Sequence, residues 1–195
     1  MKLHEALFSK TRCAVLALFL LNPRRRFFVR EVVARLGSGH GTVQKELERL
    51  AQVGVLSSCR EGMHRFYQAN TDCTVYEDLK RVLDHTVGPV GRLREALGPL
   101  RGDITVAFIY GSVAGDAALD DSDIDLMVVG STTLDALVRV VRPVEDALGR
   151  EVNPSVYPAA EFKERLAGGN PFLQNVMDGP RKMIIGELDE FVGLV

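Results

Sequence analysis

Cysteine is scarce in this chain, and its spacing excludes the sites that cysteines usually build. Of 195 residues only Cys13, Cys59 and Cys73 are cysteines, an odd number with no Cys-x-x-Cys spacing. The sequence therefore indicates neither a disulfide framework nor a cysteine-bound zinc ion. The four histidines are scattered and form no metal-binding motif. This cysteine usage predicts the reducing environment of the cytoplasm.

A hydrophobic run long enough to cross a membrane is also lacking. The apolar segment 14–21 (AVLALFLL) is too short for a transmembrane helix. Pro23 and the arginines 24–26 follow it, where a signal peptide would carry small residues and a cleavage site. We therefore expect a buried helix here and no membrane association. Internal repeats and low-complexity segments are absent as well.

The net charge is only −2, but its sign differs between the two halves of the chain. Residues 1–101 carry 17 Lys and Arg against 10 Asp and Glu, a net charge of +7, whereas residues 102–195 carry 7 against 16, a net charge of −9. Such asymmetry suggests two units with different partners. A basic half suits nucleic acid, and an acidic half suits cations.

Hydrophobic periodicity and turn residues predict the elements of the basic half. The expected order is a helix, a short strand, two helices and a β-hairpin, over residues 3–21, 27–29, 30–36, 42–53 and 55–69. In the helix over residues 42–53, Val43, Leu47 and Leu50 form one apolar stripe at helical spacing. The remaining side chains of this helix are mostly polar, so we expect it to present a polar face outward.

The phrase REVVARLGSGHGTVQKELERLAQVGVL and the hairpin after it resemble the winged helix-turn-helix family over residues 5–70. The resemblance implies a DNA-binding domain, assigned to residues 1–72, with helix 42–53 in the major groove and the hairpin along the backbone. The residues that it assigns to contacts with double-stranded DNA are His40, Thr42, Gln44, Lys45, Arg49, Arg60, His64 and Arg65. The alternatives are a charged helix face that only meets solvent, or a winged helix that binds protein.

Residues 73–100 are expected to form helices that link two domains. Val75, Leu79 and Leu83 stand at helical spacing, and Gly88-Pro89 interrupts the run. In dimeric DNA-binding proteins such helices often carry the dimer contact, so a homodimer is one expectation and a packed linker is the other.

Strands and helices alternate in residues 101–195, which predicts a small α/β domain with a mixed sheet. Strands are expected at residues 104–110, 124–129, 151–157 and 183–185, and helices at 132–148, 159–166, 172–177 and 187–195. The Thr132-x-x-Asp135 pattern is typical of a capping box at the start of the first of these helices. The fold class predicted for the whole chain is α/β in two domains.

Residues 111–125 read GSVAGDAALDDSDID and lie between two apolar runs. A tight Gly-Ser turn after a strand can hold a phosphate with its backbone N–H groups and the Ser112 hydroxyl. Asp123 and Asp125 are two apart on an extended segment, so their carboxylates leave the same face and repel each other. A divalent cation between them would relieve the repulsion, and Mg²⁺ held by carboxylates and substrate phosphates is the usual form of such a site.

This segment resembles the active-site signature of the DNA polymerase β-like nucleotidyltransferases, above all the minimal nucleotidyltransferases, over roughly residues 100–160. The resemblance implies that Asp123 and Asp125 bind two Mg²⁺ ions and that Gly111 and Ser112 bind the phosphates of a nucleoside triphosphate, taken to be ATP. Asp120 and Asp121 would only add negative charge, and Ser122 would shape the turn.

A third carboxylate normally stands on the next strand of this family, and here the position that aligns best holds Asn153. An amide can offer its oxygen to Mg²⁺ but is no useful proton acceptor. Glu151 shares the alternation of Asn153 and is the other candidate. The catalytic residues implied are therefore Asp123, Asp125 and Asn153, and the missing third carboxylate predicts either slow transfer or ligand sensing alone.

Two functions of different classes follow from these resemblances. In the first, the protein is a DNA-binding transcriptional regulator whose C-terminal domain binds a Mg²⁺-bound nucleoside triphosphate and senses it or transfers nucleotidyl groups. In the alternative, it is an active minimal nucleotidyltransferase of the antitoxin type, which transfers AMP to a toxin-like partner protein or to a small molecule. A scaffold that binds no nucleotide is a third reading. A template-directed polymerase is disfavoured because the chain has no room for further domains.

Overall fold

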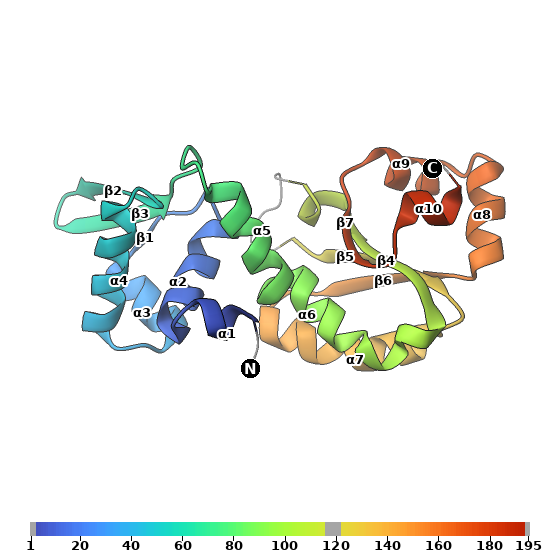
Figure 1. The fold of residues 1–195 in the computed structure, drawn as a ribbon, viewed down its shortest axis with the longest axis horizontal. Helices are drawn as coiled ribbons and strands as arrows, with labels where there is room; N and C mark the ends of the chain where they lie inside the picture. The colour runs from blue at the N-terminus through green and yellow to red at the C-terminus, as the bar shows by residue number, and fades with distance from the viewer. Residues whose placement is uncertain (1–2, 116–121, 194–195) are drawn as a thin grey trace. The chain divides into compact units, whose positions relative to one another are not determined.

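The boundary between the two units of the chain falls at Gly88-Pro89, inside the segment expected to link two domains. The units are Met1–Gly88 and Pro89–Val195 (Figure 1). The first has one hydrophobic core and the second has two. This computed structural model describes residues 3–115 and 122–193. The helix before the boundary packs in the first unit and the helix after it packs in the second, so the linking segment is divided between the two.

The described part of the first unit contains five helices and a three-stranded antiparallel sheet. The helices are α1 (Leu3–Leu7), α2 (Lys10–Leu20), α3 (Val29–Leu36), α4 (His40–Gln52) and α5 (Tyr76–Thr86), and the strands are β1 (Phe27–Phe28), β2 (Leu56–Glu61) and β3 (His64–Ala69). The strand order is β1-β3-β2, with β2 and β3 joined as a hairpin. The sequence of helices and hairpin agrees with the order expected for the basic half.

The prediction of a single helix over residues 3–21 is wrong, because the structure has two helices there, α1 and α2. Ser9 is extended and caps α2, its hydroxyl accepting a hydrogen bond from the backbone N–H of Arg12 at 3.4 Å. Serine is among the best residues at this position because its oxygen satisfies an orphan N–H of the first turn. Periodicity alone does not register such a break.

The apolar run of α2 forms the centre of the first core, as expected for a buried helix. Val15, Phe19 and Leu20 have no exposed surface. Phe19 packs edge to face against Phe27 of β1, with ring centroids 5.3 Å apart. Burying side chains of this size contributes about 1.5–3 kcal/mol each, which explains why the run lies inside the unit.

The described part of the second unit is a four-stranded mixed sheet with helices on both faces (Figure 1). Its strands are β4 (Ile104–Tyr110), β5 (Ile124–Gly130), β6 (Val152–Tyr157) and β7 (Lys182–Ile185), and its helices are α6 (Pro89–Ala96), η1 (Gly98–Asp103), η2 (Gly111–Val113), α7 (Leu134–Leu148), α8 (Ala159–Ala167), α9 (Pro171–Asp178) and α10 (Leu188–Val192). The strand order is β6-β5-β4-β7. β5 and β6 are parallel, whereas β4 is antiparallel to both β5 and β7, so the expected mixed sheet is confirmed.

The start of α7 differs from the expected capping box. Thr133, and not Thr132, caps the helix, since its hydroxyl accepts a hydrogen bond from the backbone N–H of Ala136 at 3.3 Å. The oxygen of Thr132 is buried and has no hydrogen-bond partner among the described residues. Thr133 has Ala136 three residues on, so it caps the helix without the acidic residue that a capping box requires. The last expected helix is shorter than predicted and ends at Val192.

Alternation along β4 and β5 sends side chains to two separate cores. Ile109 and Leu126 join the core beneath α6 and α7, whereas Phe108 and Met127 join the core beneath α8, α9 and α10. Successive strand residues point to opposite faces. Asp125 therefore lies on the same face as Met127, which is the face covered by α8, α9 and α10.

None of the helices described, over residues 3–115 and 122–193, has the length and apolar character needed to span a membrane.

Candidate functional site

The chain turns sharply where β4 ends, and this turn reaches toward a carboxylate of β5. Gly111 has a φ of +73°, a conformation that residues with a side chain rarely adopt. A Cβ at this position would lie 2.6 Å from Oδ2 of Asp125. Val113 is buried and anchors the turn, whereas Ser112 is exposed. The glycine thus lets backbone approach the carboxylate and leaves the serine hydroxyl open to solvent.

Asp123 and Asp125 bracket the first residue of β5 and leave the sheet on the same face. Asp125 is partly buried and Asp123 is exposed. Burial, and next the nearby carboxylate of Asp123, raise the pKa of Asp125 above its ordinary value. Both effects penalise the ionised form, and a divalent cation between the two carboxylates would offset them.

Asn153 lies beside this acidic pair because of how β6 joins the sheet. The parallel register of β5 and β6 pairs Asp125 with Asn153. The side-chain amide of Asn153 donates a hydrogen bond to Oδ2 of Asp123 at 3.5 Å. Glu151 is exposed and precedes the strand, and its backbone carbonyl accepts from the N–H of Ile124 at 2.8 Å. The group next to the two carboxylates is therefore a neutral amide.

Sequence reasoning missed two polar side chains on this face. Tyr110 is paired with Asp125 across β4 and β5, and its hydroxyl lies 3.4 Å from Oγ of Ser155 on β6. Burial raises the pKa of Tyr110 above its ordinary value. The period of two from Asn153 to Ser155 was a signal for the serine, whereas nothing local marks Tyr110 as a neighbour of the acidic pair.

Arg150 holds the chain that enters the acidic pair. Its guanidinium donates to the backbone carbonyl of Ser122, with Nε at 2.7 Å and a second contact from Nη2. This fixes the residue before Asp123 and was not anticipated from the sequence. Asp120 and Asp121, expected to add negative charge, lie outside the described residues.

Among the described residues, the donor set suits one hard cation better than two. Carboxylate and amide oxygens are ligands that Mg²⁺ accepts, alongside phosphate oxygens and water. Within residues 3–115 and 122–193, however, no group of three or more His, Cys, Asp and Glu side chains is placed to hold a metal ion. The acidic pair therefore fits Mg²⁺, but the third charged ligand that a two-ion site expects is an amide here.

The residues assigned to DNA contacts all lie on α4 or on the β2–β3 hairpin, and all are exposed. They are His40, Thr42, Gln44, Lys45 and Arg49 on α4, and Arg60, His64 and Arg65 on the hairpin. Two of them already have partners on their own helix. Gln44 donates to Glu48 at 3.0 Å, and Arg49 pairs with Glu46 at 3.5 Å.

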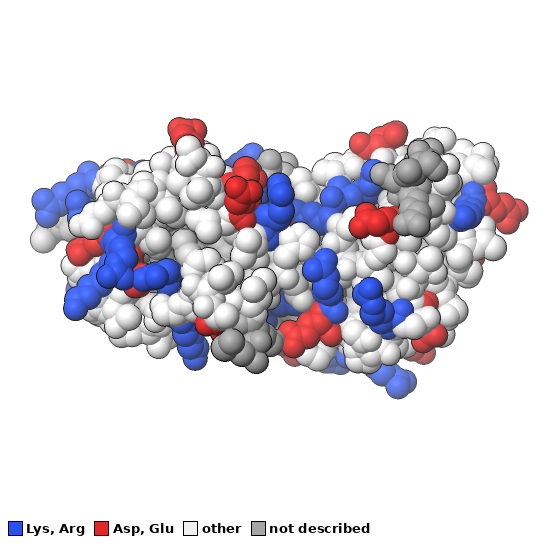
Figure 2. Space-filling view, viewed as in Figure 1, with Lys and Arg blue, Asp and Glu red and all other residues white. Residues whose placement is uncertain are grey.

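A cavity of about 370 Å³ separates α4 from the hairpin. Gln44 and Glu48 line it from α4, and Arg60 and Arg65 line it from the hairpin. The antiparallel register places the two arginines directly opposite each other, an arrangement that costs stability. Figure 2 shows Lys and Arg side chains at the end of this unit where the hairpin lies.

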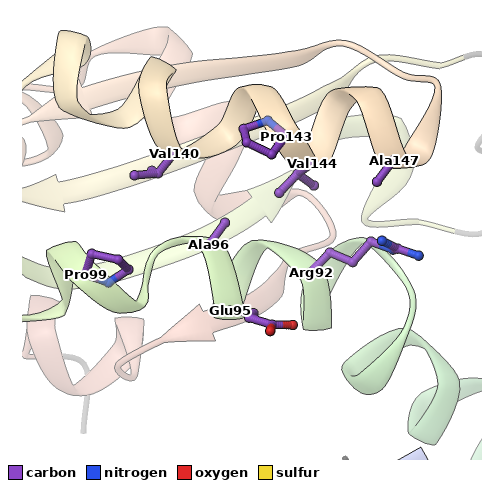
Figure 3. Close-up of a pocket in the computed structure, with 8 residues that line it drawn as sticks. All are labelled: Arg92, Glu95, Ala96, Pro99, Val140, Pro143, Val144 and Ala147. Carbon is purple, nitrogen blue, oxygen red and sulfur yellow. The ribbon is translucent and has the colours of Figure 1, made fainter.

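A second cavity, of about 360 Å³, lies between α6 and α7 in the second unit (Figure 3). Its walls are mostly apolar, with Val140 and Val144 on α7, and Arg92 and Glu95 are its charged residues. These helices cover the face of the sheet opposite to the acidic pair. The cavity is therefore separate from the site built by Gly111 and the two aspartates.

Comparison with known proteins finds a family match in the part of the second unit that contains this site. Residues 99–160, which run from η1 through β6 and contain the turn, the acidic pair and Asn153, match the family model "Polymerase beta, Nucleotidyltransferase". No curated protein matches the chain. The class that these findings support is a polymerase β-like nucleotidyltransferase domain within the second unit.

Two solved structures are similar to part of the chain. One is a mutant of the toxin–antitoxin pair MntA-HpeT, with a TM-score of 0.39, and the other is a toxin–antitoxin with AMP-PNP, with a TM-score of 0.38. Each is 15% identical in sequence to this chain, covering 54% of it and 82% of the solved chain.

Proposed function

We propose that the second unit binds a Mg²⁺-bound nucleoside triphosphate, ATP in the first instance, and transfers its nucleotidyl group to a hydroxyl of a protein or small molecule. The observation that carries this proposal is the close approach of the Gly111 turn to the carboxylate of Asp125. If residue 111 had a Cβ, that atom would lie 2.6 Å from Oδ2 of Asp125. Such an approach would set a phosphate on the turn beside a cation on the carboxylates. The match of residues 99–160 to the nucleotidyltransferase model agrees with it.

In this proposal the chain binds and orients more than it reacts. Asp123 and Asp125 would hold the cation, and Gly111 and Ser112 would hold the phosphates. A Mg²⁺ ion held there would supply positive charge to offset that of the phosphates. The acceptor oxygen forms a bond to the α-phosphorus. The bond from the α-phosphorus to the oxygen that bridges the α- and β-phosphates breaks, and pyrophosphate leaves. Asn153 cannot take the acceptor's proton, which passes to solvent, so transfer is slow.

Thermal melting of the full chain with ATP, GTP, CTP and UTP tests the proposal, each with and without Mg²⁺. A ligand at a hundredfold excess over its dissociation constant stabilises the folded state by about 2.7 kcal/mol. We expect a rise in melting temperature that requires Mg²⁺. If no nucleotide raises it at saturating concentrations, the nucleotide site does not exist and the transfer proposal fails with it.

A second function, binding of double-stranded DNA by a winged helix in the first unit, is favoured by one specific observation. Arg60 and Arg65 face each other across the hairpin, and Glu48 of α4 lines the same cavity. A phosphate group near both would turn their repulsion into attraction. The exposed face of α4, including Lys45, would then supply contacts to base edges.

Replacing Arg65 by serine should weaken DNA binding equally for all sequences. One lost phosphate contact lowers the salt slope of the binding constant by about 1. Binding of a random-sequence duplex at several salt concentrations measures it. Arg81, exposed on α5, gives the matched control, and Arg81→Ser should leave the slope unchanged.

The stability of the same variant separates binding from folding. Removing one of two opposed arginines should not lower the melting temperature, because the pair repels in the free protein. An unchanged salt slope in Arg65→Ser, or an equal change in Arg81→Ser, contradicts the placement of DNA on the hairpin.

A further inference from the structure

An exposed aromatic ring stands beside the acidic pair, on the same face of the sheet. Phe172 is the second residue of α9 and is 41% exposed. The helix that carries it is firmly placed. Asn170 caps α9 by accepting from the N–H of Leu173 at 3.1 Å, and Leu173 and Val176 are buried in the core below. Phe172 is therefore presented to solvent from a rigid position.

The ring of Phe172 is joined to the acidic pair through a single side chain. It packs nearly perpendicular to the ring of Tyr110, with centroids 5.9 Å apart and an interplanar angle of 78°. Tyr110 in turn is the residue paired with Asp125 across the two central strands. The hydroxyl of Tyr110 is taken up by Ser155. Across this face the carboxylate of Asp125, the phenol of Tyr110 and the exposed ring of Phe172 therefore follow one another.

A ligand that covered the exposed part of this phenyl ring would gain the free energy of burying apolar surface. Exposed apolar surface gives up about 25 cal/mol per Å² relative to burial. Nucleobases stack on aromatic side chains, and such stacking tolerates any base because every base has a π face. A nucleotide whose phosphates lie on the Gly111 turn and the acidic pair has its base at the other end of the molecule. Two aromatic rings contact Tyr110, those of Phe108 and Phe172, and of these only Phe172 is exposed.

We propose that Phe172 is the stacking surface for the base of the nucleoside triphosphate. This inference rests on the proposed function and adds how the site distinguishes a nucleotide from a bare polyphosphate. Because stacking uses the π face that every base has, this contact would favour nucleotides over tripolyphosphate strongly and separate the four bases only weakly.

The test compares two ligands that differ by the nucleoside. Isothermal titration of the full chain with Mg²⁺-ATP and with Mg²⁺-tripolyphosphate is measured for the wild type, for Phe172→Ala and for Phe172→Tyr. Loss of a base-stacking ring costs about 5- to 150-fold in affinity. We expect Phe172→Ala to weaken ATP by such a factor and to leave tripolyphosphate unchanged, and Phe172→Tyr to bind both like the wild type.

A matched control guards against a general effect of removing apolar surface. Leu134 is 51% exposed on α7, which covers the opposite face, and Leu134→Ala should bind both ligands normally. Equal ATP affinity in wild type and Phe172→Ala overturns the inference, as does an equal loss of both ligands. If wild-type protein binds neither ligand, the proposed function itself fails, and this outcome differs from the others.

Discussion

Replacing Asp125 by asparagine is expected to abolish the Mg²⁺-dependent stabilisation by ATP and to raise the melting temperature of the ligand-free protein. The first effect follows because one of two carboxylates that hold the cation is lost. At a hundredfold excess of ligand the missing stabilisation is about 2.7 kcal/mol, or roughly 5–10 °C for a chain of this size. Thermal melting with and without Mg²⁺-ATP measures both effects in one experiment.

The rise without ligand follows from the pKa of Asp125, which burial and Asp123 raise. A carboxyl group with a raised folded-state pKa stabilises the fold while protonated. This contribution is lost as pH rises from the ordinary pKa of aspartate through the raised value. The free energy of unfolding of the wild type should therefore fall over that window, and Asp125→Asn should lack this fall.

An equal change of charge elsewhere provides the control for Asp125→Asn. Asp146 is exposed on α7, on the side of the sheet away from the site, so Asp146→Asn should keep the full response to Mg²⁺-ATP. A Mg²⁺-dependent shift that survives in Asp125→Asn would show that the cation is held elsewhere. A lower melting temperature of the ligand-free variant would contradict the electrostatic cost assigned to this carboxylate.

Replacing Asn153 by aspartate is expected to increase nucleotidyl transfer by about 10²–10⁴-fold, the usual contribution of a positioned base. Position 153 is paired with Asp125 and its side chain touches Asp123, so a carboxylate there would complete a three-carboxylate site. Release of pyrophosphate from Mg²⁺-ATP measures the rate. A titration with Mn²⁺ measures the metal directly, and we expect one ion per chain in the wild type and two in Asn153→Asp.

The variant should also be less stable without metal, because its third carboxylate replaces an amide that donates a hydrogen bond to Asp123. Glu151→Gln is the companion variant, since Glu151 was the other candidate for the third position. We expect it to leave the metal count and the rate of the wild type unchanged. A loss in Glu151→Gln, with no gain in Asn153→Asp, would place the third ligand at Glu151 instead.

Strands of this chain could be predicted from its sequence more closely than helix ends. The strands over residues 104–110 and 124–129 were predicted almost to the residue, because apolar runs of that length between turn residues have few other solutions. The break at Ser9 and the cap at Thr133 were missed. Ser9 lies inside a run that periodicity reads as continuous, and Thr132, one residue before the actual cap, carries the Thr-x-x-Asp spacing of a capping box.

The sequence by itself determined that Asp123 and Asp125 share a face, because side chains alternate along any strand, and that Gly111 follows a strand in a turn. Only the tertiary structure decided what stands beside them. The parallel pairing of β5 with β6 places Asn153 next to the acidic pair. The packing of α9 places the ring of Phe172 against Tyr110. Residues far apart in the chain meet according to strand register and helix docking, which depend on the free energy of burying whole faces and not on any local pattern.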